Sequence, residues 1–177
     1  LVLLKRAGIE VAFITAHFPA YLGDIGIEAS YAVIAMALIG FFNIIGSLSA
    51  GWLGNRMPKR WILAAIYLAR SVVTVGLLMS VPDVASPISV FGIQTTVGVV
   101  SALVFGASTG LLWLSTVPPT AGLVAKFFGL GNMATLFGIV MLSHQVGGFL
   151  GAYLGGLSLT YTGDFSWMWY ADIALAV

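Results

Sequence analysis

The chain has 177 residues, of which 60% are hydrophobic and only 7% are charged, and its formal net charge is +1. A soluble domain carries about 25% charged residues and needs a polar surface, so this composition excludes a soluble globule and indicates that lipid is the solvent. The low net charge argues against a nucleic-acid partner. The absence of cysteine excludes disulfides and cysteine-based metal sites, and two histidines far apart in the sequence are a poor metal site. We therefore expect no cofactor and no metal.

Long apolar runs divide the chain into predicted membrane-spanning helices. A spanning helix needs about 20 mainly apolar residues, and these runs are too long for barrel strands. We therefore predict an all-α membrane protein, a six-helix transmembrane bundle whose sixth helix is truncated. Because the chain starts without methionine and stops within an apolar run, we expect it to be part of a longer protein. The predicted helices are residues 4–22, 30–54, 61–80, 89–117, 133–159 and 165–177.

The first predicted helix carries three polar side chains on one face. Glu10 and His17 are seven residues apart, and His17 and Tyr21 are four apart, which places them on the same side of a helix. A histidine can carry a coupling proton near neutral pH, so His17 and Tyr21 are candidates for substrate or proton binding. The alternative is a histidine that hydrogen-bonds to a neighbouring helix. Pro19 predicts either a kink or the end of this helix.

A basic corner, the sequence GWLGNRMPKR at residues 51–60, separates the second and third predicted helices. It contains Arg56, Lys59 and Arg60, three of the seven basic residues of the chain. Along the chain, basic connections alternate with connections that carry only aspartate and glutamate. Basic connections face the cytoplasm, so we expect this corner and the N-terminal end of the chain to be cytoplasmic.

Arg70 lies halfway along the third predicted helix, at membrane depth. A charged residue there costs about 2.5–3.5 kcal/mol on insertion scales, which makes it a functional candidate by default. Its guanidinium could bind a substrate carboxylate with two hydrogen bonds, or it could form a structural ion pair or a conformational lock. Glu10 and Asp172 are the two possible partners, and the sequence does not choose between them.

The fourth and fifth predicted helices add polar candidates at similar depth. Thr109 and Trp113 lie on one face of the fourth helix, and a tryptophan beside hydroxyl groups suits a small amphipathic ligand. His144 and Gln145 lie in the middle of the fifth helix. The alternative for each is ordinary packing or hydrogen bonding between helices.

An internal repeat relates the two halves of the chain. A shift of about one hundred residues places GSLSAGWLG, at 46–54, on GGFLGAYLG, at 147–155. The same shift places the first helix on the fourth and the third on the sixth. Because three is odd, the second three-helix unit is inverted relative to the first, an arrangement typical of secondary transporters. Rows of small residues four apart in these segments also predict close helix packing.

At the basic corner the sequence resembles the cytoplasmic loop motif of the major facilitator superfamily, roughly G-x-L-(A)-D-R-x-G-R-(R/K). The residues that carry the resemblance or replace a typical motif residue include Gly51, Asn55, Arg56, Lys59 and Arg60. Asn55 stands where aspartate is typical, so a charge latch made by this loop is expected to be weaker. The segments 111–129 and 135–156 look like those of bacterial members related to the monocarboxylate transporter branch.

The resemblance implies that the chain is the C-terminal half of a twelve-helix transporter in the bacterial inner membrane. Its partners would then be membrane lipid, a small-molecule substrate and the missing N-terminal half. The first and fourth predicted helices would line the central cavity, whereas the third would lie outside it. The resemblance therefore favours a structural or conformational role for Arg70 and Glu10 over substrate contact.

These observations favour a secondary transporter that moves a small solute by alternating access. A small organic anion with proton coupling fits the branch resemblance, the buried arginine and the histidines. Efflux of a lipophilic compound and a membrane scaffold without transport are the alternatives. The sequence has no phosphate-binding G-x-x-x-x-G-K-[ST] loop and no nucleophile–base set, so we do not expect an ATP-driven pump or an enzyme.

Overall fold

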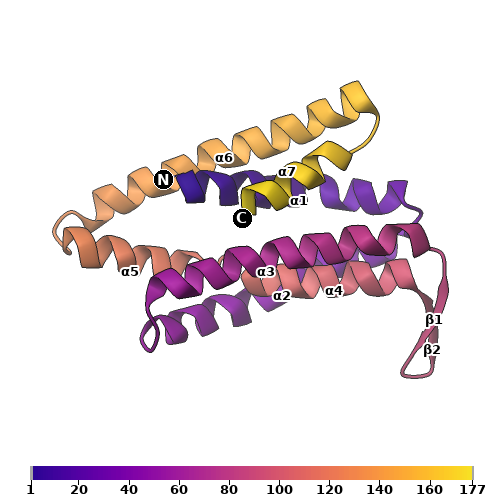
Figure 1. Ribbon diagram of the computed structural model, residues 1–177, viewed down its shortest axis with the longest axis horizontal. Coiled ribbons are helices and arrows are strands. Elements are labelled where there is room, and N and C mark those ends of the chain that lie inside the picture. The colour runs from indigo at the N-terminus through magenta and orange to yellow at the C-terminus, as the bar shows by residue number, and fades with distance from the viewer. Residues whose placement is uncertain (1, 177) are drawn as a thin grey trace.

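The computed structural model describes the backbone of residues 2–176 and the side chains of residues 7–174 (Figure 1). Most of this backbone is helical, which confirms the predicted all-α class. One short 3-10 turn, η1 (Val81–Asp83), and a two-stranded hairpin, β1 (Pro87–Val90) with β2 (Ile93–Thr96), follow the third helix. The helices are α1 (Val2–Asp24), α2 (Ala29–Gly54), α3 (Lys59–Ser80), α4 (Val97–Leu112), α5 (Val117–Phe128), α6 (Met133–Thr162) and α7 (Ser166–Ala176).

Four helical segments of the described chain are long and apolar enough to cross a membrane. α1 is not among them by hydropathy, although it is 23 residues long and lies along α6. A helix of about 20 residues spans the hydrocarbon core, so all four segments have enough length to cross with some tilt. They are Ala29–Gly54, Lys59–Asp83, Val97–Phe128 and Met133–Thr162.

The packing of the helices follows the internal repeat. The two most extensive helix pairs are α1 with α6 and α2 with α4, and the hundred-residue shift exchanges one pair for the other. α3 and α7, which the shift also exchanges, pack against each other and against α4 and α1 respectively. Figure 1 shows these helices running roughly along one common direction. This is the packing expected of two related three-helix units.

Glycines allow close backbone contact in the two main helix pairs, α1 with α6 and α2 with α4. A Cβ atom on Gly151 of α6 would overlap the carbonyl oxygen of Ile9 in α1, and one on Gly46 of α2 would overlap the carbonyl oxygen of Leu111 in α4. In lipid, where apolar burial does not drive helices together, such close backbone contact supplies much of the attraction. The predicted packing role of these small-residue rows is confirmed at both positions.

The fourth predicted helix, residues 89–117, is wrong at both ends. Residues 87–96 form the β-hairpin, whose turn residues Phe91 and Gly92 both have positive φ, at 49° and 83°. Paired β-branched residues around a turn that contains glycine favour a hairpin over a helix start. At the other end, α4 stops at Leu112 and α5 begins at Val117, with Pro118 in its first turn, where proline is tolerated.

Aromatic side chains fill the centre of the bundle between α1, α4 and α7. Trp169 of α7 lies 4.9 Å from Phe13, 4.9 Å from Tyr21 and 6.0 Å from Phe105, measured between ring centroids. Trp169 and Phe13 are almost completely buried. This aromatic core holds α7 against α1 and so positions the polar residues of the next turn of α7.

Candidate functional site

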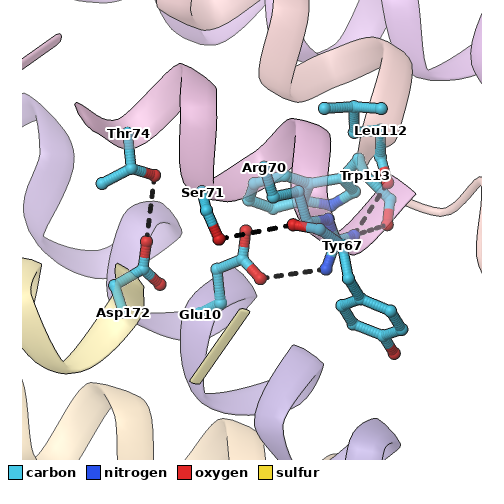
Figure 2. A network of polar contacts seen from close by, with 8 residues as sticks. All are labelled: Glu10, Tyr67, Arg70, Ser71, Thr74, Leu112, Trp113 and Asp172. Atoms are coloured by element: carbon cyan, nitrogen blue, oxygen red, sulfur yellow. Dashed lines mark hydrogen bonds and ion pairs between the residues drawn. The ribbon is translucent and has the colours of Figure 1, made fainter. Parts of the chain in front are cut away.

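A cluster of buried polar groups joins α1, α3, α4 and α7 in the interior of the bundle (Figure 2). Glu10 is 5% exposed, Arg70 3% and Asp172 3%. Ionised side chains are rarely this buried unless they are paired, because removal of a charge from water costs several kcal/mol. We refer to Glu10, Arg70, Thr74 and Asp172 as the charge cluster.

Arg70 is the centre of the charge cluster. Its Nη1 atom donates to Oε2 of Glu10 at 3.0 Å, and its Nη2 atom donates to the backbone carbonyls of Leu112 at 2.8 Å and Trp113 at 2.5 Å (Figure 2). The structure thus identifies Glu10 as the ion-pair partner of Arg70. Arg70 thus links α3 to α1 and to the end of α4. Both terminal nitrogens of its guanidinium already donate hydrogen bonds to protein groups.

The carbonyls that bind Arg70 are free because the backbone leaves the helical path after Leu112. The last carbonyls of a helix have no partner within it, and they carry partial negative charge at the C-terminal end of the helix dipole. Non-helical backbone at membrane depth is tolerated only where protein groups or water satisfy it. Arg70 supplies hydrogen bonds for two carbonyls of the break, and it also neutralises part of the dipole.

Asn43 of α2 also binds the break between α4 and α5. Its Oδ1 atom accepts a hydrogen bond from the backbone N–H of Leu114 at 3.1 Å. The sequence predictions did not include this bond. The signal that could have indicated it is the double proline at 118–119, which marks a helix start inside a long apolar run.

We expect Asn43→Val to destabilise the protein by about 1–2 kcal/mol, because it leaves the Leu114 N–H without its partner in a nonpolar environment. The loss can be measured as a drop in the unfolding midpoint in detergent. Ser49→Ala is the matched control on the same helix, since the Ser49 hydroxyl donates to the backbone carbonyl of Ile45 in its own helix. Equal midpoints for the two variants would contradict the role given to Asn43.

Asp172 completes the charge cluster from α7. Its Oδ2 atom accepts a hydrogen bond from the hydroxyl of Thr74 at 3.1 Å, across 98 positions of sequence. Among the residues that the structure describes, Oδ1 of Asp172 and Nε1 of Trp169 are buried side-chain atoms without a hydrogen-bond partner. From the sequence, Asp172 is only a possible partner of Arg70, and its bond to Thr74 cannot be predicted from residues so far apart.

The two histidine candidates lie on the α1–α6 pair. Nε2 of His17 lies 3.0 Å from the backbone carbonyl of Ala152, and the ring packs against Phe13 and Phe165. This bond corresponds to the alternative of a histidine that links two helices. His144 is half-buried, and its backbone carbonyl lies where a Cβ atom of Gly8 would be. Their roles in substrate or proton binding stay predictions.

The other four candidates differ in exposure. Tyr21 packs on Trp169 and Thr109 is buried in α4, whereas Trp113 is half-buried and Gln145 of α6 is exposed. Only Trp113 is joined to the charge cluster, through its backbone carbonyl. The six candidates therefore lie on different parts of the bundle, on α1, α6 and the end of α4, and their roles stay predictions.

The basic corner forms a tight turn between α2 and α3. Nζ of Lys59 donates to the carbonyl of Gly54 at the end of α2 at 3.1 Å, and the guanidinium of Arg56 lies 3.8 Å from the centroid of the Trp52 ring. The backbone N–H of Asn55 bonds to α2 carbonyls, so this residue caps the helix without using its side chain. A Cβ atom on Gly51 or Gly54 would meet nothing within 4 Å, so close packing does not require these glycines.

An open cavity of about 780 Å³ lies beside the basic corner, between it and the end of α5. Its described lining residues include no acidic residue. They include four basic residues, Arg56, Lys59, Arg60 and Lys126. Lys126 lies in the last turn of α5. The cavity is therefore suited to an anionic group.

Comparison with known proteins identifies relatives of the chain. A family model described as Major Facilitator Superfamily matches residues 7–152. The chain is 31% identical over 157 residues to a protein from Bacillus subtilis named "Uncharacterized MFS-type transporter YcxA". That alignment covers 88% of this chain and 35% of the relative, so the chain spans about a third of the relative's length.

Proposed function

Because the chain belongs to the major facilitator superfamily, we propose that it is the C-terminal half of a secondary transporter that moves a small organic anion together with a proton. The transporter would work by alternating access, with its other half packed against this one in the bacterial inner membrane. Its partners are then membrane lipid, the small-molecule substrate and the N-terminal half.

The observation that best supports transport is the interrupted helix α4–α5 inside the bundle. Secondary transporters form their sites from discontinuous helices at the interface of inverted repeats, where unwound backbone can bind a solute or change its partners. Here the break is held by two side chains, Arg70 from α3 and Asn43 from α2. A scaffold without transport has no need of a break in the membrane that must be stabilised by a buried ion pair.

The proposed orientation places the basic corner in the cytoplasm. In Figure 1 the turn between α2 and α3, the start of α1 and the connection between α5 and α6 lie at one end of the bundle. The basic residues in and next to these segments therefore gather at that end, whereas Asp24, Asp83 and Asp164 lie at or just after the ends of α1, α3 and α6, at the other end. This distribution is the one expected when the basic end faces the cytoplasm.

We propose that the candidates with exposed or half-buried side chains contact the substrate. His17, Trp113, His144 and Gln145 meet this condition, whereas Tyr21 and Thr109 are buried against their neighbours. A histidine and an amide side chain can donate hydrogen bonds to a carboxylate, and Trp113 offers an apolar surface for the rest of a small organic acid.

A second candidate function is the efflux of lipophilic compounds. A cavity of about 590 Å³ lies between α2, α3 and the end of α4, and its lining is mainly apolar, including Leu48, Trp52 and Ile66. A cavity of this size and character fits an apolar molecule better than a carboxylate. The distinguishing measurement is whether carboxylates or apolar compounds drive proton movement.

The test is the internal pH of proteoliposomes that contain the full-length protein while small carboxylates are added outside. We expect one or more acids to acidify the interior beyond the leak of protein-free liposomes. His17→Ala should raise the acid concentration that gives half the maximal rate by about tenfold, the effect of one lost hydrogen bond to a charged group. Thr15→Ala is the matched control, since its hydroxyl bonds to Val11 within α1. No response to any acid would favour the efflux function.

A further inference from the structure

We infer that Asp172 is a proton-binding site, which holds a proton in the arrangement described here and exchanges it through a cavity at the acidic end of the bundle. Only the part that Asp172 would play in transport rests on the proposed function. The site itself follows from the charges, the hydrogen bonds and the cavity around α7.

The first step is the count of buried charges. The charge cluster has two carboxyl groups, Glu10 and Asp172, and one cation, Arg70, and each of these residues is at most 5% exposed. With all three ionised, the cluster would carry one uncompensated negative charge in the interior of a membrane-embedded bundle. Such a charge is neutralised by a proton rather than kept, because an unpaired buried ion costs far more than a buried neutral group.

The second step is the choice between the two carboxyl groups. Glu10 accepts a direct hydrogen bond from Arg70 at 3.0 Å, which favours its ionised form. The only hydrogen-bond partner described for Asp172 is the neutral hydroxyl of Thr74. A hydroxyl can donate to a carboxylate or accept from a carboxylic acid, so the Thr74 contact serves both protonation states. The proton is therefore on Asp172.

Among the residues whose side chains the structure describes, Arg70 is the one cation that acts on Asp172, and no second cation is available to replace the proton. The charged groups that act on it are Glu10 from α1 and Arg70 from α3. α4 has no titratable side chain in its sequence, and α7 has none besides Asp172 and Tyr170. On α6, the hydroxyl of Ser158 donates to the backbone carbonyl of Asp164, in the connection between α6 and α7.

The third step is access for the proton. A cavity of about 530 Å³ opens at the end of the bundle opposite the basic corner and is lined by Asp24, Asp164, Tyr21 and Trp169 among others. Asp172 is one turn beyond Trp169 on α7, about 4.5 Å farther along the helix axis. The unpaired indole N–H of Trp169, a residue that lines the cavity, and the unpaired Oδ1 of Asp172 thus lie on the same side of α7.

Proton loading then forms one O–H bond on the Asp172 carboxyl and takes one proton from the water of the cavity. Release breaks that bond, returns the proton to water in the cavity and leaves a second buried carboxylate, on which Arg70 acts as the compensating cation of the described chain. Because Arg70 also holds Glu10 and the break after α4, a change in the charge of Asp172 bears on the contact between α1, α3 and α4. This is the physical link between a proton and a helix movement.

The direct test is infrared difference spectroscopy of the full-length protein at neutral pH. We expect the carbonyl band of a protonated carboxylic acid that is lost in Asp172→Asn and retained in Asp83→Asn, the same substitution at an exposed aspartate. Thr74→Val should keep the band but shift its frequency, because the carboxyl group loses its hydrogen-bond partner. A spectrum in which Asp172→Asn and Asp83→Asn match the unmodified protein would overturn the inference.

A transport measurement separates this inference from the proposed function. In proteoliposomes, Asp172→Asn should abolish substrate-driven acidification and retain exchange of labelled substrate, since asparagine imitates the protonated carboxyl group permanently. Acidification that persists in Asp172→Asn would refute the role of Asp172 while leaving the proposed transport in place. An infrared band at Asp172 without any acid-driven proton movement would instead refute the proposed coupling and leave the proton site standing.

Discussion

Replacement of Arg70 by methionine is expected to prevent recovery of stably folded protein. The substitution leaves the carboxylate of Glu10 buried without a partner and removes the hydrogen bonds to the carbonyls of Leu112 and Trp113. Breaking a buried ion pair by removal of one partner costs about 3–5 kcal/mol, a large part of the stability of an ordinary domain. The measurement is the yield of monodisperse protein in detergent and its unfolding midpoint.

The control for this prediction is a double variant in which both charges are removed. Arg70→Met combined with Glu10→Leu should recover part of the lost stability, because no unpaired charge then remains between α1 and α3. Recovery should be incomplete, since the carbonyls after α4 stay without the guanidinium. If the single Arg70→Met variant unfolds at the same temperature as the unmodified protein, the bonds of Arg70 to α1 and to the end of α4 do not stabilise the fold. Our account of the break after α4 would then be wrong.

The class of the fold could be predicted from the sequence because lipid demands long apolar helices and leaves little choice of structure. The start of α4 could not, because residues 87–96 are as apolar as a helix start and only the Phe91–Gly92 turn distinguishes them as a hairpin. The stop at Leu112 was likewise hidden within a continuous apolar run. Pro118 and Pro119 mark a new helix start there, but proline in a membrane helix also fits a simple kink.

The charge cluster was only partly predictable for a different reason. The cost of a buried charge requires that Arg70 have an acidic partner, and Glu10 was one of the two acids proposed. The choice between Glu10 and Asp172 depends on how three helices pack, and 60 residues separate Arg70 from Glu10. The bonds of Arg70 to backbone carbonyls have no sequence signal of their own, since they arise from the break after α4. Hydropathy therefore located the arginine, and tertiary packing determined its partners.

Gly151→Val is the substitution from which we expect the largest loss of helix packing. A Cβ atom at this position would overlap the backbone carbonyl of Ile9, which cannot move without α1 itself, so the α1–α6 pair must separate. Overpacking of this kind costs about 3 kcal/mol at the upper end of its usual range, and here the loss includes the close contacts that hold helices together in lipid. The measurement is the unfolding midpoint in detergent, together with substrate uptake by proteoliposomes.

Gly156→Val is the matched control, because it makes the same change on the same helix where a Cβ atom would meet nothing within 4 Å. Both variants share the cost of a β-branched residue in a helix, so their difference isolates the contact with α1. Gly46→Val tests the repeat, since Gly46 of α2 contacts the Leu111 carbonyl of α4 as Gly151 contacts Ile9. Equivalent losses at Gly46 and Gly151, with little at Gly156, are expected if the two helix pairs are built alike; a neutral Gly46→Val would show that only one pair depends on close backbone contact.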